Sequence, residues 1–169
     1  DRLVDSVYSA VCGGHTENAS ELWDHHLTPL KGIVCPFCTL SPYYEWKRNF
    51  QLKTIQDKLN EQGYRLALIK EIKVLERSSS GRVRKVQLIG RNGQRETISG
   101  KEFRNIIGPN EFKSNYYDVV MRGYFFDLDG KGWGHGVGMC QWGAYGMALE
   151  RYKYQDILQY YYPGSEIIS

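Results

Sequence analysis

The segment from Gly130 to Gly146 limits the possible folds of this chain more than any other stretch. It reads G-K-G-W-G-H-G-V-G-M-C-Q-W-G-A-Y-G, with seven glycines among aromatic and polar residues. Glycine inside a regular element costs roughly 0.5–1 kcal/mol relative to Ala, so a cluster is expected where φ is positive or where backbone approaches a ligand or another backbone. Flexible linkers are rich in Ser instead. The segment therefore predicts an ordered loop that presents Trp, His and Gln side chains.

Length and charge exclude several classes of protein. The chain has 169 residues, which is long enough for one domain. Its formal net charge of +3 is too small for a typical nucleic-acid binder. We therefore predict a single domain over residues 1–169 and no nucleic-acid partner. No apolar run approaches the ~20 residues that span a bilayer, so no membrane span is expected within this chain. Residues 2–8 read as a strand already under way, so we expect the chain to be part of a longer protein.

Periodicity and turn residues predict more strands than helices. Leu52, Ile55 and Leu59 fall at helical spacing before a stop at Gly63, and the dipeptide Asn92-Gly93 predicts a hairpin. The strands are expected at 3–11, 43–50, 66–74, 83–89, 96–99, 116–122 and 124–128, and the further helices at 101–107, 139–152 and 154–161. Because the helices are not interleaved regularly with the strands, the predicted class is α+β, with a mainly antiparallel sheet and a few short helices.

Two short-spaced pairs of residues predict a metal site. Cys12-x-x-His15 and Cys35-x-x-Cys38 both have the spacing of zinc ligands, and the loop between them lets the two turns face each other. Four such ligands leave no open position, so the predicted ion is a structural zinc that staples this loop. A disulfide between Cys35 and Cys38, a disulfide from Cys12 to one of them, and free thiols are the alternatives.

Three blocks of the sequence carry a resemblance to a known family. They are V-Y-S-A-V-C-G-G-H-T-E-N-A-S-E-L-W (7–23), S-G-R-V-R-K-V-Q-L-I-G (80–90) and W-G-H-G-V-G-M-C-Q-W-G-A-Y-G-M-A (133–148). Together, and in this order, they resemble the stage II sporulation protein D family, which includes a sporulation lytic transglycosylase and the amidase enhancers. The resemblance covers essentially the whole chain.

The resemblance implies cleavage of the bond between N-acetylmuramic acid and N-acetylglucosamine in peptidoglycan. A carboxylic acid protonates the glycosidic oxygen, and the muramyl 6-hydroxyl closes a 1,6-anhydro ring. The family's catalytic Glu is expected upstream of Asp1, so the chain alone lacks it, and Glu17 is a weak substitute that more simply orients its turn. Some members carry a similar Cys/His set. The family usually has Ser at the position of Cys140, which we interpret as a small buried residue.

The same resemblance directs attention to side chains that could line a glycan site. His135 lies between glycines, Trp133 and Trp142 offer faces for sugar rings, and Gln141 can both donate to and accept from an N-acetyl group. Each of these residues taken singly is also explained by packing in the core. Asp127 beside the glycine segment fits a ligand contact or an ordinary turn.

Three functions remain open at this stage. The chain is the downstream portion of a peptidoglycan lytic transglycosylase, a non-catalytic wall-binding module that stimulates a cell-wall amidase, or a zinc-stapled scaffold without a glycan role. The first two place it outside the cytoplasm, in the cell envelope, with peptidoglycan glycan strands as partner. The resemblance favours the first, in cell-wall remodelling or sporulation.

Overall fold

The computed structural model describes residues 3–24 and 28–168 and confirms the α+β class. The chain folds into two compact units. The first unit is discontinuous and combines residues 1–45 with residues 131–169, whereas the second is the continuous stretch 46–130. Each unit has its own cluster of buried apolar side chains. The single domain over residues 1–169 remains a prediction.

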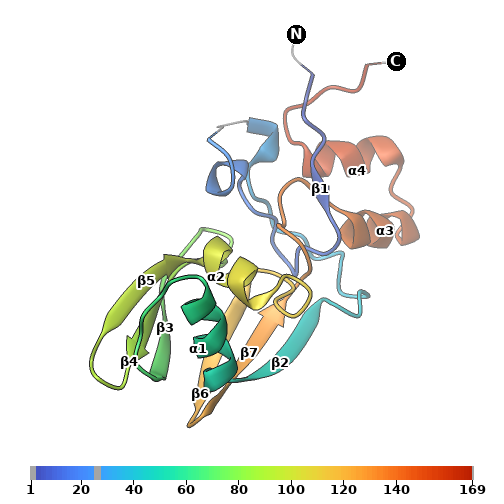
Figure 1. The fold of residues 1–169 in the computed structure, drawn as a ribbon. Coiled ribbons are helices and arrows are strands. Elements are labelled where there is room, and N and C mark those ends of the chain that lie inside the picture. The colour runs from blue at the N-terminus through green and yellow to red at the C-terminus, as the bar shows by residue number, and fades with distance from the viewer. Residues whose placement is uncertain (1–2, 25–27, 169) are drawn as a thin grey trace. The chain divides into compact units, whose positions relative to one another are not determined.

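Two three-stranded sheets form most of the second unit (Figure 1). One has the order β2-β7-β6 and the other the order β3-β4-β5, with antiparallel pairing between β3 and β4, β4 and β5, and β6 and β7. The strands are β2 (Glu45–Gln51), β3 (Ile69–Arg77), β4 (Val83–Gly90), β5 (Arg95–Ser99), β6 (Tyr117–Arg122) and β7 (Phe125–Lys131). The expected strands therefore form, with some ends unchanged and the others shifted by up to three residues.

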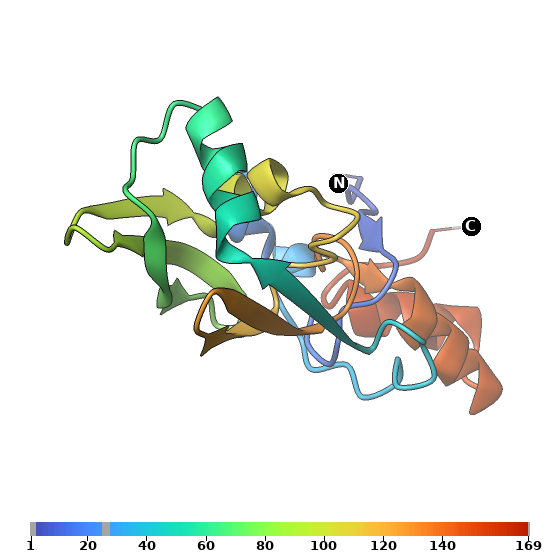
Figure 2. The same cartoon turned by 60° about the horizontal axis from the view of Figure 1, so that its bottom comes forward.

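Two helices complete this unit, and they lie side by side in Figure 2. The helix α1 (Leu52–Glu61) buries the apolar positions that its periodicity predicts, and its chain turns at Gly63 with φ 89°. The helix α2 (Gly100–Ile107) is capped at its N-terminus by Ser99. The Ser99 side chain accepts the Glu102 N–H and so satisfies one of the donors at the helix start. Both helices and both sheets contribute to one apolar core.

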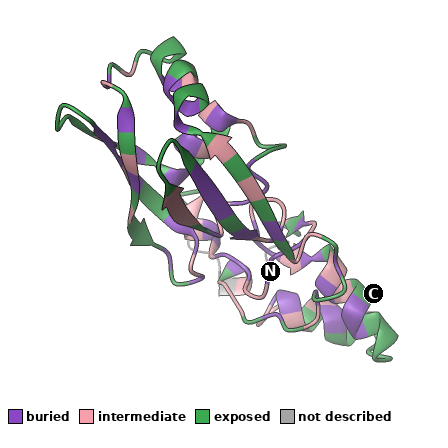
Figure 3. Ribbon diagram, turned by 90° about the horizontal axis from the view of Figure 1, so that it is seen from below, coloured by how far each residue is buried: buried purple, intermediate pink, exposed green. Residues whose placement is uncertain are grey.

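Buried and exposed residues are mixed along the strands of the second unit, as Figure 3 shows. In the middle of β4, Val86 and Leu88 are fully buried, while Lys85 is exposed and Gln87 is half-buried. The hairpin between β4 and β5 turns at the predicted Asn92-Gly93, where Gly93 has φ 84°. The period of two therefore explains which face of this sheet meets the core.

The first unit is built from short elements. A two-stranded parallel sheet pairs β1 (Tyr8–Ser9) with β8 (Met139–Cys140), and two helices follow, α3 (Gln141–Leu149) and α4 (Tyr154–Tyr161). Two single 3-10 turns, Ala19–Glu21 and Thr28–Leu30, lie in the N-terminal half. No helix in the described residues is both long and apolar enough to cross a bilayer.

Two sequence-based boundaries need correction in this unit. The strand expected over 3–11 is reduced to β1, because only two of its residues pair with β8, while Val11 makes an isolated bridge to Trp133. The helix expected over 139–152 begins at Gln141, because Met139 and Cys140 belong to β8.

Candidate functional site

The glycine segment forms an ordered arc, as the sequence predicts. Four alternate glycines have positive φ: Gly132 at 74°, Gly134 at 104°, Gly136 at 82° and Gly138 at 74°. This is a backbone conformation that L side chains rarely adopt. A β-carbon at Gly138 would also collide with the carbonyl oxygen of Val7.

Main-chain hydrogen bonds fasten this arc to the N-terminal segment. Val11 and Trp133 exchange two of them, at N···O distances of 2.8 and 3.2 Å. The Glu17 N–H donates to the Gly136 oxygen at 2.8 Å. These bonds hold the N-terminal segment and the glycine arc side by side, although they are more than a hundred residues apart in the sequence. The positions of the side chains on both segments are thereby fixed.

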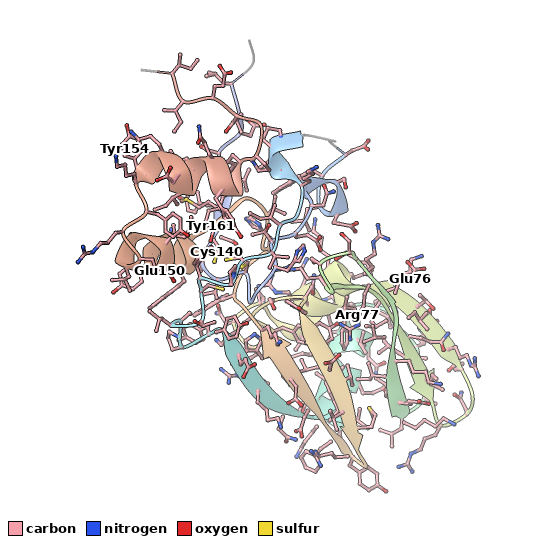
Figure 4. All side chains as sticks on the ribbon, turned by 180° about the vertical axis from the view of Figure 1, so that it is seen from behind. Glu76, Arg77, Cys140, Glu150, Tyr154 and Tyr161 are labelled. Atoms are coloured by element: carbon pink, nitrogen blue, oxygen red, sulfur yellow. The ribbon has the colours of Figure 1, made fainter. Side chains whose placement is uncertain are left out.

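Four cysteine thiols come together in the interior of the first unit. The Sγ atoms of Cys12, Cys35, Cys38 and Cys140 lie within 4.8 Å of one another, all four residues are fully buried, and none forms a disulfide. Figure 4 shows Cys140 beside the two C-terminal helices, next to Tyr161. Four thiols in this arrangement are close enough to hold a metal ion.

The spacing between the thiols fits tetrahedral ligation. Ligands about 2.3 Å from a central zinc ion are about 3.8 Å from each other, and the Cys12 and Cys38 Sγ atoms are 3.7 Å apart. Main-chain N–H groups of Cys12 and Gly143 donate to the Cys140 Sγ at 3.2 and 3.3 Å. Such bonds orient and stabilise a metal-bound thiolate. The residues present therefore suit a metal of the zinc class.

Cys140 occupies the place in this cluster that the sequence analysis gave to His15. The His15 Nδ1 lies 2.7 Å from the Thr16 oxygen, and the His15 backbone forms an isolated bridge to Val34. His15 is not among the residues of the cluster. Gly13 and Gly14, both with positive φ, change the chain direction between Cys12 and His15. The parallel pairing of β1 with β8 brings Cys140 in instead.

Hydrogen bonding within the cluster separates the acidities of the thiols. Bonds with Cys12 and then with Cys140 lower the pKa of the Cys38 thiol far below its ordinary value. The pKa of Cys12 is raised, chiefly by its hydrogen bond with Cys140. Within the cluster, Cys38 therefore loses its proton most readily, and Cys12 retains its proton and donates a hydrogen bond.

The second candidate site lies at His135, on the glycine arc. The Val137 N–H donates to the His135 Nδ1 at 3.0 Å, so the proton of the neutral ring is on Nε2. The Trp23 indole lies against this imidazole, with ring centroids 5.7 Å apart and planes at 71°. Glu17 is 3% exposed, and its Oε1 accepts the Asn18 N–H at 2.8 Å. An indole, an imidazole and a buried carboxylate therefore come from the two fastened stretches.

The other predicted glycan-binding residues have different surroundings. The Trp133 ring meets Tyr43 edge to face at 4.5 Å. The half-buried Trp142 packs against the apolar cluster of this unit and meets Tyr145 at 5.7 Å, while Gln141 is exposed at the start of α3. A glycan-binding role for these three residues remains a prediction.

The sequence analysis did not propose Trp23 as a ligand-binding residue. Its signal was its place at the end of the family-like block 7–23, with Glu17 six residues before it. Asp127, by contrast, is explained structurally, because its carboxylate accepts from Asn49 at 2.8 Å and pairs with Arg122. These bonds, the one from Asn49 first, lower the pKa of Asp127.

The second unit has an open pocket of its own, of about 540 Å³, between the turn that follows α1 and the helix α2. Tyr64 and Glu102 line it and are joined by a hydrogen bond of 2.5 Å, which raises the pKa of Tyr64 to about 12. None of the sequence-predicted site residues lines this pocket.

Comparison with known proteins identifies a family and several relatives of this chain. Residues 38–138 match the model of a family described as a domain of unknown function (DUF8618). Stage II sporulation protein D of Bacillus subtilis is 30% identical over 164 residues, which is 97% of this chain and 45% of that protein. An uncharacterized protein of Brachyspira hyodysenteriae is 29% identical over 99% of this chain and 44% of its own length.

A shorter match connects the chain to a third protein. The amidase enhancer of Bacillus subtilis is 40% identical over 73 residues, which is 43% of this chain and 10% of that protein. The chain spans less than half the length of the curated relatives it matches. By its family match and its relatives, the chain belongs to the DUF8618 domain family and is a homologue of stage II sporulation protein D.

Proposed function

We propose that this chain binds peptidoglycan glycan strands as part of a lytic transglycosylase that acts on bonds between N-acetylmuramic acid and N-acetylglucosamine. The observation that carries the proposal is the main-chain bond from Glu17 to Gly136, which fastens the segment that contains Glu17 and Trp23 to the glycine arc that carries His135. Relatives named for sporulation and for enhancing an amidase support a cell-wall role in the envelope, outside the cytoplasm.

The side chains of this site suit binding and orientation. His135 offers its Nε2–H to a sugar oxygen, because Nδ1 is already engaged by Val137. Glu17 accepts the Asn18 N–H, which fits a carboxylate that orients the turn better than one that donates a proton to a leaving group. We therefore propose that Glu17 orients the turn and is not the general acid.

Incubation of purified peptidoglycan with the chain, alone and within the native full-length protein, tests the proposal. Mass spectrometry should detect 1,6-anhydromuramyl products with the full-length protein, and His135→Ala should reduce both product and glycan binding while the circular dichroism spectrum is unchanged. Full-length protein that binds no glycan would contradict the proposal.

A second function is favoured by the match to the amidase enhancer. In that case the chain binds the wall without cleaving it and stimulates a cell-wall amidase. The two functions differ in the same experiment, because an enhancer binds glycan and yields no anhydro product. Added amidase would then release stem peptides faster in the presence of the chain.

We also propose that the four-cysteine cluster holds a structural zinc ion. Four thiolates supply soft ligands and leave no open position, which is typical of structural rather than catalytic zinc. Metal analysis of purified protein should find about one zinc per chain. Cys140→Ser should lower both zinc content and stability, because metal binding and folding are coupled.

The matched control is His15→Ala. The His15 ring is directed to Thr16 rather than into the cluster, so this variant should retain its zinc. Loss of zinc from His15→Ala together with full retention by Cys140→Ser would restore the ligand set expected from the sequence and overturn the four-cysteine site.

A further inference from the structure

We propose that Trp23 is a stacking platform for one pyranose ring of the glycan, with His135 as the hydrogen-bond donor at its rim. This inference rests on the proposed function and specifies the ligand of that site as a β-1,4-linked, N-acetylated aminosugar strand. It assigns to Trp23 the role that the sequence pattern suggested for Trp133 and Trp142.

Exposure separates Trp23 from the other tryptophans. Trp23 is 40% exposed, whereas Trp46 is 8% exposed in the core of the second unit and the remaining two are half-buried. Burial of indole surface is favourable, so an exposed indole stabilises a complex only if a partner covers it. Trp23 is therefore the tryptophan with the most surface available for a ligand.

Hydrogen bonds fix the backbone that carries this indole. The main-chain N–H of Trp23 donates to the Ala19 oxygen at 2.9 Å, directly after the short 3-10 turn, and the Asn18 side chain caps that turn by accepting the Ser20 N–H. Glu17, at the start of the same segment, is bonded to the arc at Gly136. An aromatic ring on a fastened turn loses little entropy when a ligand binds.

The chemistry of the corner matches a sugar. The imidazole and indole planes meet at 71°, so the two rings do not stack face to face. A pyranose has the complementary form, because its axial C–H bonds make an apolar face and its hydroxyl and acetamido groups point outward from the rim. The Nε2–H of His135 can donate to such an oxygen.

The inference is tested by titrating the full-length protein with a β-1,4-linked N-acetylglucosamine tetramer in a calorimeter. Trp23→Ala should weaken binding about tenfold, and Trp23→Phe should recover part of the loss because it restores an aromatic face. The matched control is Tyr154→Ala, a 64% exposed aromatic residue on α4, labelled in Figure 4, which should bind like the native protein.

Fluorescence supplies a readout that a merely structural role would not change. Saturating tetramer should shift the emission of the native protein to shorter wavelength and protect it from acrylamide quenching, and Trp23→Phe should lose both effects while still binding. Native protein that binds the tetramer as tightly as Trp23→Ala would overturn the platform alone. Native protein that does not bind it at all would overturn the platform and the glycan-binding function together.

Discussion

The hydroxyl of Tyr161, on α4, lies 3.0 Å from the Sγ of Cys35. The two residues are 126 positions apart, and both are almost completely buried. The last helix of the chain therefore makes a direct polar contact with a ligand of the proposed metal site. Partners of this kind orient metal ligands, and mutating them commonly lowers metal affinity.

Tyr161→Phe should lower the free energy of unfolding by about 1 kcal/mol, the usual net contribution of one hydrogen bond. It should also speed the loss of zinc to a chelator, measured with a colorimetric dye. Tyr160→Phe is the matched control, because its hydroxyl donates to the Val34 oxygen at 2.6 Å and not to a cysteine. Equal rates of zinc loss from the two variants would contradict a role for Tyr161 at the metal site.

Gly143→Ala should destabilise the protein by roughly 1–3 kcal/mol, the range for overpacking a core. In an ordinary helix this substitution is stabilising by about 1 kcal/mol, but here the new β-carbon would meet the Tyr161 hydroxyl and lie 2.7 Å from the Cys35 Sγ. Gly63→Ala is the control for backbone strain alone, because Gly63 has positive φ and open space around it. Urea unfolding should show the larger loss for Gly143→Ala, accompanied by loss of metal.

Asp127→Asn should change how stability depends on pH. Because hydrogen bonds from Asn49 and Arg122 lower the pKa of Asp127 in the folded state, the carboxylate stabilises the fold above its unfolded pKa of about 3.9. That contribution is lost as the pH falls below this value. Native protein should therefore be more stable than the variant at pH 7, and the difference should shrink on going to pH 3. A difference that is constant over this range would refute the assignment.

Ser9→Ala should raise the stability of the protein. The Ser9 hydroxyl is buried and has no hydrogen-bond partner in the described part of the chain, and an unsatisfied buried group costs about 1–3 kcal/mol. Removing it should raise the melting temperature by roughly 2–4 °C per kcal/mol recovered. A lower melting temperature by calorimetry would show that this hydroxyl contributes a stabilising interaction.

Features encoded by neighbouring residues could be predicted from the sequence. The helix through Ile55 and Leu59, the hairpin at Asn92-Gly93 and the α+β class depend on periodicity and turn chemistry within a few residues. The ordered arc followed from the same reasoning, because alternate glycines in a polar and aromatic segment predict positive φ.

Features that depend on distant pairing could not be predicted in this way. Cys140 joins the cluster because β1 pairs with β8 in parallel, with Ser9 opposite Cys140, and no local pattern specifies that register. The approach of Trp23 to His135 likewise depends on the bond from Glu17 to Gly136. The available signal for the four-cysteine cluster was that the chain has four cysteines in all, whereas the C-x-x-H spacing directed attention to His15.

The discontinuity of the first unit has a consequence for the order in which the protein is made. A ribosome releases the chain from its N-terminus, so Cys12, Cys35 and Cys38 emerge long before Cys140, and the whole of residues 46–130 is synthesised in between. The side chain of Trp46 packs directly on Gly130, so this intervening unit begins and ends at adjacent points and can close while synthesis continues. The first three thiols are therefore synthesised well before their fourth partner, which follows only after residues 46–130 have been made.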